Sequence, residues 1–392
     1  MDISILSIEL QEFIDRNLNT DVSQLALQKN KFTPSDWTAI LNQIAAKQKA
    51  KIKLPSWYNT KDIIYPSKIS IEQTSSEKTA LYKSNLVSGI SLIDLTGGFG
   101  VDDFYFAKKV NQVIHCEIND ELSEIVAYNL NTLKVKNIEC IAGDSSAVLK
   151  NKNQYFDWIY IDPSRRNDAK GKVFLLKDCL PNVPELLDFY FEFTANIMIK
   201  TAPILDITAG ISELKNVKNI HIISVDNEVK ELLWILEKNY TNKIEVICCN
   251  INKDQTDQFV FDYGNSNTSN YSLPKKYLYE PNAAIMKSGG FDEITVQFPL
   301  EKLHQHSHLY TSDKRIDFPG RIFEIENCIE YQKHSMKSIL ENIKANITTR
   351  NFPETVENIR KKWKIKEGGN VYCFFTTDLN NNKIVLLCNK LK

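Results

Sequence analysis

The sequence has few glycines and prolines and no long apolar run, and each absence excludes a class of protein. Its 392 residues include 13 Gly and 12 Pro, with 43% hydrophobic and 25% charged residues, a composition typical of a globular chain. No uninterrupted apolar stretch approaches the roughly 18 residues that a membrane span requires. The opening MDISILSIELQEFIDRN carries acids where a secretory signal needs basic residues. We therefore expect a multi-domain, cytoplasmic protein that does not bind a membrane.

Metal-ligand and disulfide spacings are also missing. The eight cysteines form no CxxC pair, and several lie in apolar runs where a thiol acts as a small hydrophobe. His304, His306 and His308 would share one face of a strand, but without Cys or carboxylate partners they are typical of surface residues. We expect no metal site. A covalent mechanism through Cys179 is disfavoured, because no Pro-Cys marks the motif before it.

Charge is balanced overall but not along the chain. The formal net charge is -1, which argues against a protein coated throughout by a polyanion. From Tyr331 to the end, however, there are 12 Lys or Arg and 5 Asp or Glu, a surplus of seven positive charges. This segment is a candidate for contact with a polyanion such as RNA.

The apolar pattern divides the chain into four parts. Residues 1–74 indicate short amphipathic helices, one of them over 34–50, which we expect to pack on the next domain; the basic run 47–53 leaves contact with nucleic acid as the alternative. Residues 75–271 predict a doubly wound, Rossmann-like α/β domain, with a polar, turn-rich end from 253. Residues 272–320 indicate a small α+β domain, and 321–392 a strand, helix, strand, helix and hairpin. The seven strands of the α/β domain are expected at 91–95, 112–117, 138–142, 158–161, 197–201, 220–225 and 244–248.

The strongest motif is LIDLTGGFGVDD, a strand and turn that lead into a helix and offer as cofactor-binding residues Asp94, Thr96, Gly97, Gly98 and Gly100. Without a Cβ, Gly98 and Gly100 let the backbone approach a ligand. The fingerprint of dinucleotide-binding proteins needs a small residue where this chain has Asp103, and a phosphate near Asp102 and Asp103 would meet like charge, so a dinucleotide is disfavoured. The P-loop motif of nucleoside triphosphate-binding proteins is absent from the sequence. S-adenosyl-L-methionine brings cationic groups instead of phosphates, so the acids favour it.

Two later strands supply further candidates for the cofactor. Glu117 ends VIHCEIN about twenty residues on, where an acid holds the two ribose hydroxyls. Asp144 and Ser145 follow the next strand, where an acid or amide takes the adenine amino group. An Asp at a strand end is also typical of a helix cap.

The stretch FDWIYIDPSRR brings Asp162, Pro163 and Ser164 to the carboxyl edge of the sheet, where open α/β sheets bind ligands. Here residues 75–250 resemble class I methyltransferases. In members that methylate exocyclic base nitrogens, this motif accepts hydrogen bonds from the target amino group, so the resemblance implies a catalytic site at these three residues. Arg165 stands where such enzymes have an aromatic residue. We expect Arg165 and Arg166 to contact RNA, with surface ion pairs as the alternative.

Two wider resemblances point to RNA. DLTGGFGVD is similar to the first motif of bacterial small-subunit rRNA guanine-N2 methyltransferases. Nearly the whole chain resembles a bacterial family of assigned methyltransferases with a ferredoxin-like insert and a C-terminal THUMP-like domain, through EQTSSEKTALYK, IDPSRR, IKTAPILDI, YLYEPNAAIMKSGGF and KANITTRNFPETVENIRKKWKIKEGG. THUMP-type modules imply RNA binding, here through a basic patch beside Trp363 that comprises Lys344, Arg350, Arg360, Lys361, Lys362, Lys364 and Lys366. A solvated basic helix with a core Trp is the alternative.

Together these features predict an S-adenosyl-L-methionine-dependent methyltransferase that presents a flipped or unpaired base of a structured RNA, such as rRNA or tRNA, near Asp162. Two alternatives stay open. One is a methyltransferase for proteins or small molecules, whose acidic group would meet the arginine pair. The other is a non-catalytic RNA-binding or assembly protein with a methyltransferase-like scaffold.

Overall fold

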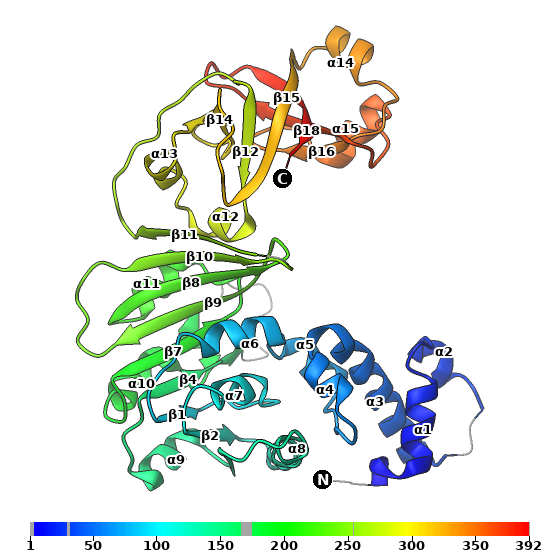
Figure 1. The fold of residues 1–392 in the computed structure, drawn as a ribbon, viewed down its shortest axis with the longest axis vertical. Coiled ribbons are helices and arrows are strands. Elements are labelled where there is room, and N and C mark those ends of the chain that lie inside the picture. Colours follow the sequence, from blue (N-terminus) through cyan, green and yellow to red (C-terminus); the bar gives the residue numbers. More distant parts are fainter. Residues whose placement is uncertain (1–3, 30–31, 166–174, 254, 392) are drawn as a thin grey trace. The chain divides into compact units, whose positions relative to one another are not determined.

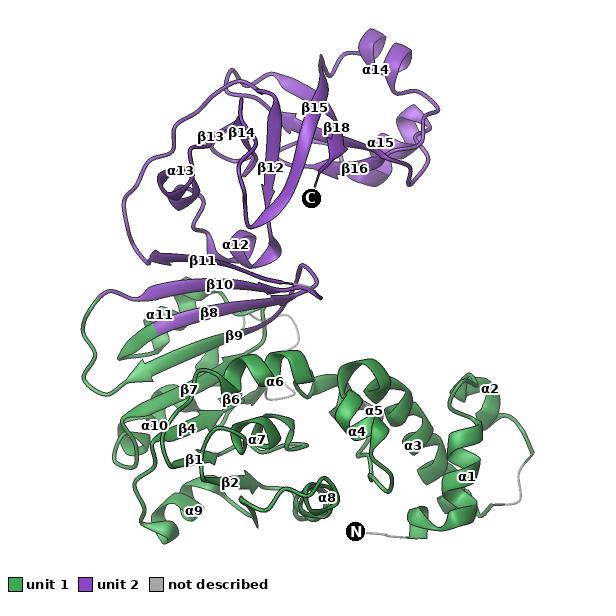
Figure 2. Cartoon of the chain, in the orientation of Figure 1, with its two compact units in different colours: residues 1–218, 232–242 green, residues 219–231, 243–392 purple. Residues whose placement is uncertain are grey.

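The computed structural model describes residues 4–29, 32–165, 175–253 and 255–391, without the side chains of residues 68, 69 and 165 (Figure 1). The chain forms two compact units (Figure 2). The first comprises Met1–Lys218 and Leu232–Asn242, and the second Asn219–Glu231 and Lys243–Lys392. None of the described helices is long and apolar enough to cross a membrane. Among the same residues, no group of three His, Cys, Asp or Glu side chains is arranged to hold a metal ion.

The N-terminal segment is helical, as expected, with the 3-10 turn η1 and the helices α1 (Ile8–Arg16), α2 (Val22–Ala26), α3 (Pro34–Lys53), α4 (Pro55–Asn59), α5 (Lys68–Gln73) and α6 (Glu77–Ser84). Thr33 caps α3 by accepting a hydrogen bond from the Asp36 amide at 3.1 Å. Trp57 of α4 is buried against Phe104, with ring centroids 4.8 Å apart. These helices therefore share a core with the α/β domain.

The basic run 47–53 is engaged by this helical segment. Lys47 pairs with Asp15 at 2.7 Å, and Lys53 donates to the Glu72 carbonyl at 2.6 Å. Lys49 lies 3.3 Å from the Glu72 carboxylate. Three of the four lysines in this run thus have partners within the helical segment, in agreement with the packing interpretation; Lys51 is exposed.

The larger sheet has nine strands in the order β11-β10-β8-β9-β7-β4-β1-β2-β3. Seven coincide with the predicted strands: β1 (Ser91–Asp94), β2 (Gln112–Glu117), β3 (Ile138–Ala142), β4 (Trp158–Ile161), β7 (Asn196–Thr201), β8 (Val217–Val225) and β10 (Glu245–Ile251). The neighbours β1-β2, β2-β3, β1-β4, β4-β7 and β8-β10 pair in parallel. A Rossmann-like α/β fold is confirmed, and because parallel strands end at the same edge, their last residues meet there.

The prediction of seven strands was two short. It missed β9 (Glu228–Glu237), which pairs antiparallel with β7, and β11 (Thr256–Asp262), which lies in the segment expected to be turn-rich. The sequence EVKELLWILE of β9 is rich in residues that favour helices. Its strand state follows from a tight reversal at Asp226-Asn227, which both have positive φ, and from six consecutive buried residues.

The connections of the α/β domain are α7 (Val101–Phe106), α8 (Asp120–Thr132), α9 (Ser145–Lys152), α10 (Val183–Tyr190) and α11 (Ile207–Glu213), with η2 (Leu176–Asp178). A two-stranded ribbon joins β5 (Ser164–Arg165) to β6 (Cys179–Leu180). The short helix α7 begins directly after the glycine turn, at Gly100, and the ribbon begins directly after Asp162-Pro163. Both predicted ligand motifs thus lie in strand-to-helix or strand-to-loop connections at the carboxyl edge.

The second unit contains a seven-stranded sheet in the order β13-β14-β12-β15-β18-β17-β16. Its elements are β12 (Tyr277–Pro281), α12 (Ala283–Ser288), α13 (Glu293–Gln297), β13 (Glu301–Lys302), β14 (Tyr310–Ser312), β15 (Gly320–Glu330), α14 (Lys333–Ile339), β16 (Asn346–Thr349), α15 (Val356–Trp363), β17 (Val371–Thr377) and β18 (Lys383–Lys390). From β15 onward the order is the predicted strand, helix, strand, helix and hairpin. The expected turns carry Gly368 and Gly369, both with positive φ, and Asn381, also with positive φ.

The alternating histidines do not lie on a strand. They occupy the turn between β13 and β14. His304 is buried and bonds to Asn381 at 3.1 Å, and the His308 ring stacks on Phe291 with centroids 3.6 Å apart. His304 was therefore wrongly interpreted as a surface residue: contacts with Asn351 and Asn381, from the following C-terminal domain, bury it.

Candidate functional site

The turn after β1 contains three glycines with three different roles. A Cβ on Gly97 would lie 2.1 Å from the ring of His115, so this residue is glycine because a buried side chain lies against it. Gly100 has φ +73°, and its Cβ would approach Val126 to 2.8 Å. At Gly98, with φ +56°, the nearest neighbour of a Cβ is the Thr96 carbonyl at 3.7 Å. Of the three, Gly98 is the position that leaves its backbone open to a ligand.

Glu117 is held at the end of β2 by two backbone amides. Its Oε2 accepts from Gly98 N–H at 2.9 Å and its Oε1 from Asn119 N–H at 2.9 Å. A carboxylate has about four acceptor positions on its two oxygens, so both oxygens keep capacity for a further donor. The half-buried Glu117 is thus oriented beside the open backbone of Gly98, where the sequence places the ribose diol.

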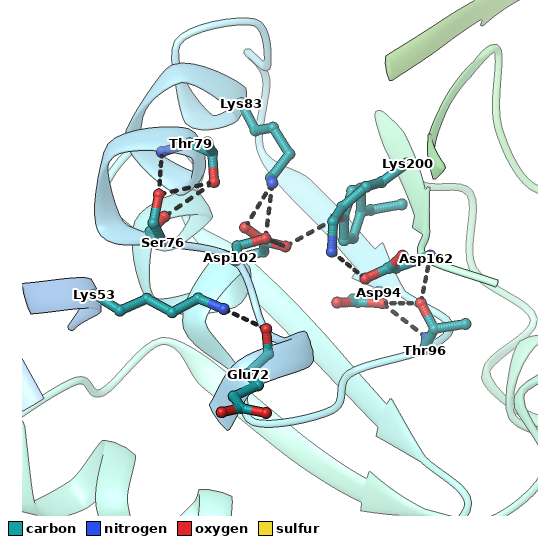
Figure 3. A network of polar contacts seen from close by, with 12 residues as sticks. Lys53, Glu72, Ser76, Thr79, Lys83, Asp94, Thr96, Asp102, Asp162 and Lys200 are labelled. Carbon is teal, nitrogen blue, oxygen red and sulfur yellow. Dashed lines mark hydrogen bonds and ion pairs between the residues drawn. The ribbon is translucent and has the colours of Figure 1, made fainter. Parts of the chain in front are cut away.

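Asp94, at the end of β1, connects the glycine turn to the strand that carries Asp162. Asp94 Oδ1 accepts from the Thr96 amide at 2.7 Å and from the Thr96 hydroxyl at 3.1 Å. The Thr96 Oγ1 in turn accepts from the Asp162 amide at 2.6 Å (Figure 3). This chain of hydrogen bonds fixes the first residue of the Asp162-Pro163-Ser164 motif against the turn.

Asp102, in the first turn of α7, is part of a buried network. It lies 3.2 Å from the fully buried ammonium of Lys83 (Figure 3). It also accepts from the hydroxyls of Ser75 and Tyr160, both at 2.8 Å. Burial raises the pKa of Asp102, but the two ammonium groups of Lys83 and Lys200 and the two hydroxyl donors together outweigh burial, so its pKa is lowered. Asp102 is therefore a compensated structural charge.

Asp103 is buried on the other side of the turn against His115. The His115 Nδ1 lies 2.6 Å from Asp103 Oδ2, and neither side chain is exposed. Burial raises the pKa of Asp103 and of Asp94 well above their usual values, each raised further by a neighbouring acid, whereas burial lowers the pKa of His115. Burial therefore disfavours the charged forms of Asp94 and Asp103.

This arrangement changes the charge argument for the methyl donor. Asp102 is neutralised by Lys83, and Asp103 is inaccessible, so neither repels a phosphate at the turn as the sequence led us to expect. Glu117 is the acid that the structure leaves partly exposed beside Gly98. The case for a nucleoside with a free ribose diol and no phosphate at this position depends on Glu117.

The catalytic candidates lie at the carboxyl end of β4. Asp162 is partly exposed, Pro163 is buried, and Ser164 is exposed on β5. The Asp162 carboxylate contacts the ammonium of Lys200, at the end of the neighbouring strand β7 (Figure 3). The backbone of Arg165 pairs with Cys179 on β6, its side chain is not described, and Arg166 lies outside the described residues.

Asp144 and Ser145 lie where β3 leads into α9. Asp144 is the N-cap of α9, because its Oδ1 accepts from the Ala147 amide at 2.9 Å. The side chain is exposed. One carboxylate oxygen of Asp144 thus caps the helix, as the alternative interpretation expected. The predicted contact with adenine would use the other oxygen.

The predicted basic patch divides into engaged and exposed cations. Arg350 donates to the buried Glu280 at 2.8 Å, and Arg360 donates to the Ile365 carbonyl at 3.4 Å. Lys362 pairs with Glu354 at 2.9 Å. Lys364 lies 3.9 Å from Glu341 but is exposed, as are Lys344, Lys361 and Lys366.

The aromatic residue of this patch is structural. Trp363 is buried in the core of the C-terminal domain and donates to the Tyr331 hydroxyl at 3.2 Å. The structure therefore agrees with the alternative interpretation of this segment, in which Trp363 is a core residue of a solvated basic helix. A stacking role for Trp363 on an RNA base is therefore excluded by its burial.

Lys200 and His115 are the site residues that sequence reasoning missed. Both lie inside predicted strands: Lys200 in the run IMIKT and His115 in VIHCE. The sequence did contain a signal for both residues, namely a single cation or imidazole within an apolar strand near its carboxyl end. Such a group needs a polar partner when it is buried.

The sheet, the glycine turn and the strand-end acids define a class I methyltransferase fold, followed by two smaller domains. Family models match a ferredoxin-like domain at residues 277–319 and a THUMP domain-like segment at residues 320–390. The chain is similar to a crystal structure of a protein from Porphyromonas gingivalis W83 that is assigned as a methyltransferase, at 29% identity over 98% of both chains and a TM-score of 0.86.

A curated relative is an uncharacterized RNA methyltransferase of Mycoplasma mobile, 31% identical over 91 residues. That match spans 23% of this chain and about a quarter of the relative's length. The resemblance to methyltransferases with a ferredoxin-like and a THUMP-like domain, drawn first from sequence motifs, is confirmed by these findings.

Proposed function

We propose that the protein transfers a methyl group from S-adenosyl-L-methionine to a nitrogen of an RNA base, preferably an exocyclic amino group. The observation that carries the proposal is the hydrogen-bonded chain Asp94-Thr96-Asp162, in which the Asp162 amide donates to Thr96 Oγ1 at 2.6 Å. It joins the turn proposed for the cofactor to the motif proposed for the target base. A transferase needs these two sites side by side.

The residues at the turn fit the cofactor. Gly98 has no side chain to obstruct a ligand, and Glu117 is oriented by two amides to accept the ribose hydroxyls. Asp144 or Ser145, where the neighbouring strand β3 leads into α9, would take the adenine amino group. The cofactor, when bound, supplies a methyl group on a positively charged sulfur. Asp162 would accept a hydrogen bond from the target amino group and so orient its lone pair.

RNA is supported as the substrate class by three observations. The relative from Mycoplasma mobile is named an RNA methyltransferase, and residues 320–390 match a THUMP domain-like model. The same segment exposes the cations Lys344, Lys361, Lys364 and Lys366. Exposed cations of this kind bind phosphates in a manner that weakens steeply with salt, which would separate RNA from a small acidic substrate.

Calorimetry with S-adenosyl-L-methionine tests the cofactor site. Hydrogen bonds to a charged group contribute about 1.5–3 kcal/mol, so Glu117→Ala should weaken binding about tenfold or more. Glu121→Ala, an exposed glutamate at the start of α8, is the matched control and should bind as the unmodified chain does. Absence of binding by the unmodified chain would favour a non-catalytic scaffold.

Transfer is tested on total RNA from cells that lack the gene, with isotope-labelled S-adenosyl-L-methionine and mass spectrometry of the nucleosides. The unmodified chain should label one nucleoside. Asp162→Ala should retain cofactor affinity and lose transfer, because the residue orients the target and not the donor. Full activity of this variant would remove the role proposed for Asp162.

A further inference from the structure

Lys200 is a buried lysine at the carboxyl end of β7. Residues 197–201 of this strand are all buried, and the Lys200 side chain is 11% exposed. Its ammonium contacts Asp162 Oδ2, whose side chain is 37% exposed. Figure 3 shows Lys200 and Asp162 pointing toward each other from adjacent strands.

The end of β7 is held rigidly. The next residue, Thr201, accepts a hydrogen bond from the indole of the fully buried Trp234 at 3.0 Å. On the other side, Asp162 is tied through its amide to Thr96. The ammonium and the carboxylate are therefore presented together with little freedom, as recognition of a planar group requires.

Lys200 also helps to compensate the buried Asp102, but that carboxylate already has the Lys83 ammonium at 3.2 Å. Packing and compensation alone therefore do not explain a lysine at this position. A buried ion pair is no more stabilising than well-packed apolar residues of similar volume, because both charges lose their hydration. The pair lies at the sheet edge where ligands bind in open α/β folds, and one of its members is accessible. A ligand that uses both charges accounts for the pair better than stability does.

The two groups form a donor next to an acceptor. The ammonium has three N–H donors and the carboxylate only acceptor positions, so each can keep the ion pair and bond a ligand. Adenine and cytosine each carry an exocyclic amino group beside a ring nitrogen that accepts. Guanine has an N1–H donor beside its amino group on the Watson–Crick edge. Its N3 acceptor lies on the other side of that amino group, next to the ribose, and uracil has no amino group.

We propose that Lys200 is a specificity residue that, together with Asp162, selects an adenine or cytosine amino group as the methyl acceptor. Lys200 donates to the ring nitrogen while Asp162 accepts from the amino group. The Watson–Crick edge of guanine would place its N1–H donor against the Lys200 ammonium, which is also a donor. A binding site built for one donor and acceptor pattern strongly rejects a base with the opposite pattern. The inference rests on the proposed function and adds the class of base to it.

The first test identifies the methylated nucleoside formed in total RNA from gene-deleted cells. Adenosine or cytidine methylated on the amino nitrogen is the expected product. A methylated guanosine or uridine, or a methyl group on carbon, overturns the role of Lys200 but leaves an RNA methyltransferase in place. Failure to bind S-adenosyl-L-methionine and to label any RNA contradicts the proposed function itself, and the inference with it.

The second test compares Lys200→Met and Lys200→Arg with Lys215→Met, which removes a lysine from an exposed ion pair with Asp188. Lys200→Met should lower transfer to the target base at least tenfold, Lys200→Arg should restore part of it, and Lys215→Met should be neutral. Calorimetry and thermal unfolding separate recognition from stability. If Lys200→Met loses cofactor affinity and thermal stability in parallel with activity, or keeps full transfer, Lys200 is structural and the inference is wrong.

Discussion

Substitution of Gly97 tests the packing beneath the cofactor turn. In Gly97→Ala the new Cβ would lie 2.1 Å from Cε1 and 2.3 Å from Nδ1 of His115, whereas ordinary contacts are about 3.5–4.0 Å. The ring cannot yield easily, because it is fully buried and bonded to Asp103 at 2.6 Å. Either the turn or the ring must shift by more than about 1 Å.

The expected loss can be estimated from these contacts. Overpacking a well-filled core destabilises by about 1–3 kcal/mol, and breaking the bond to the buried Asp103 adds about 1–3 kcal/mol. Gly97→Ala should therefore lower the free energy of unfolding of the first unit by about 2–6 kcal/mol. Urea unfolding followed by tryptophan fluorescence measures it, since Trp57 lies in the same unit and is buried.

A double-mutant cycle isolates the cause. In a His115→Ala background the ring is gone, so adding Gly97→Ala should cost less than about 1 kcal/mol. Gly98→Ala is the neighbouring control: with open space around it and φ +56°, it should cost about 1–2 kcal/mol in either background, through backbone strain alone. Equal losses for Gly97→Ala in both backgrounds would refute the reasoning.

Three further predictions follow from buried charges. Lys83→Met leaves Asp102 without its buried cation and should destabilise by about 3–5 kcal/mol in urea unfolding; a loss under about 1 kcal/mol would show that the hydroxyl donors suffice. Burial lowers the pKa of His221 to about 4, below the unfolded value near 6.5. The folded state is therefore fully stabilised above pH 6.5 and loses about 3 kcal/mol of stability from this residue as the pH falls toward 4. Thermal unfolding of His221→Gln should be less sensitive to acid over that range, and an unchanged acid sensitivity would show that His221 is not the cause. Arg350→Met removes a cation from the buried Glu280 and should unfold at a lower urea concentration than the unmodified chain. This loss of stability should be seen even where the affinity for RNA is unchanged.

Local sequence was sufficient to predict those strands of the α/β domain that consist of an apolar run followed by a turn. The strands β2, β3 and β4 have the predicted bounds. In contrast, β9 was missed because its Leu, Glu and Lys residues favour a helix, and a non-local pairing with β7 decides its state. The strand β11 was missed because polar residues surround it and its partner is β10.

The candidate site shows the same division. The order of Asp94, Glu117 and Asp162 along the chain predicted that they would meet at one sheet edge, and they do. The sequence did not reveal that Lys83 compensates Asp102 and that Asp103 is buried against His115, because these partners come from α6 and β2. The charge of the pocket was therefore misjudged from the count of its acids.

The chain's own residues determined which segments become strands, where the glycine turn falls and which acids end the strands, because apolar periodicity and turn chemistry act within a few residues. Tertiary structure alone decided that Gly97 accommodates an imidazole, that Trp363 belongs to a core and that Lys200 meets Asp162. These outcomes depend on side chains brought together from distant strands, whose desolvation and pairing do not exist before the sheet is formed.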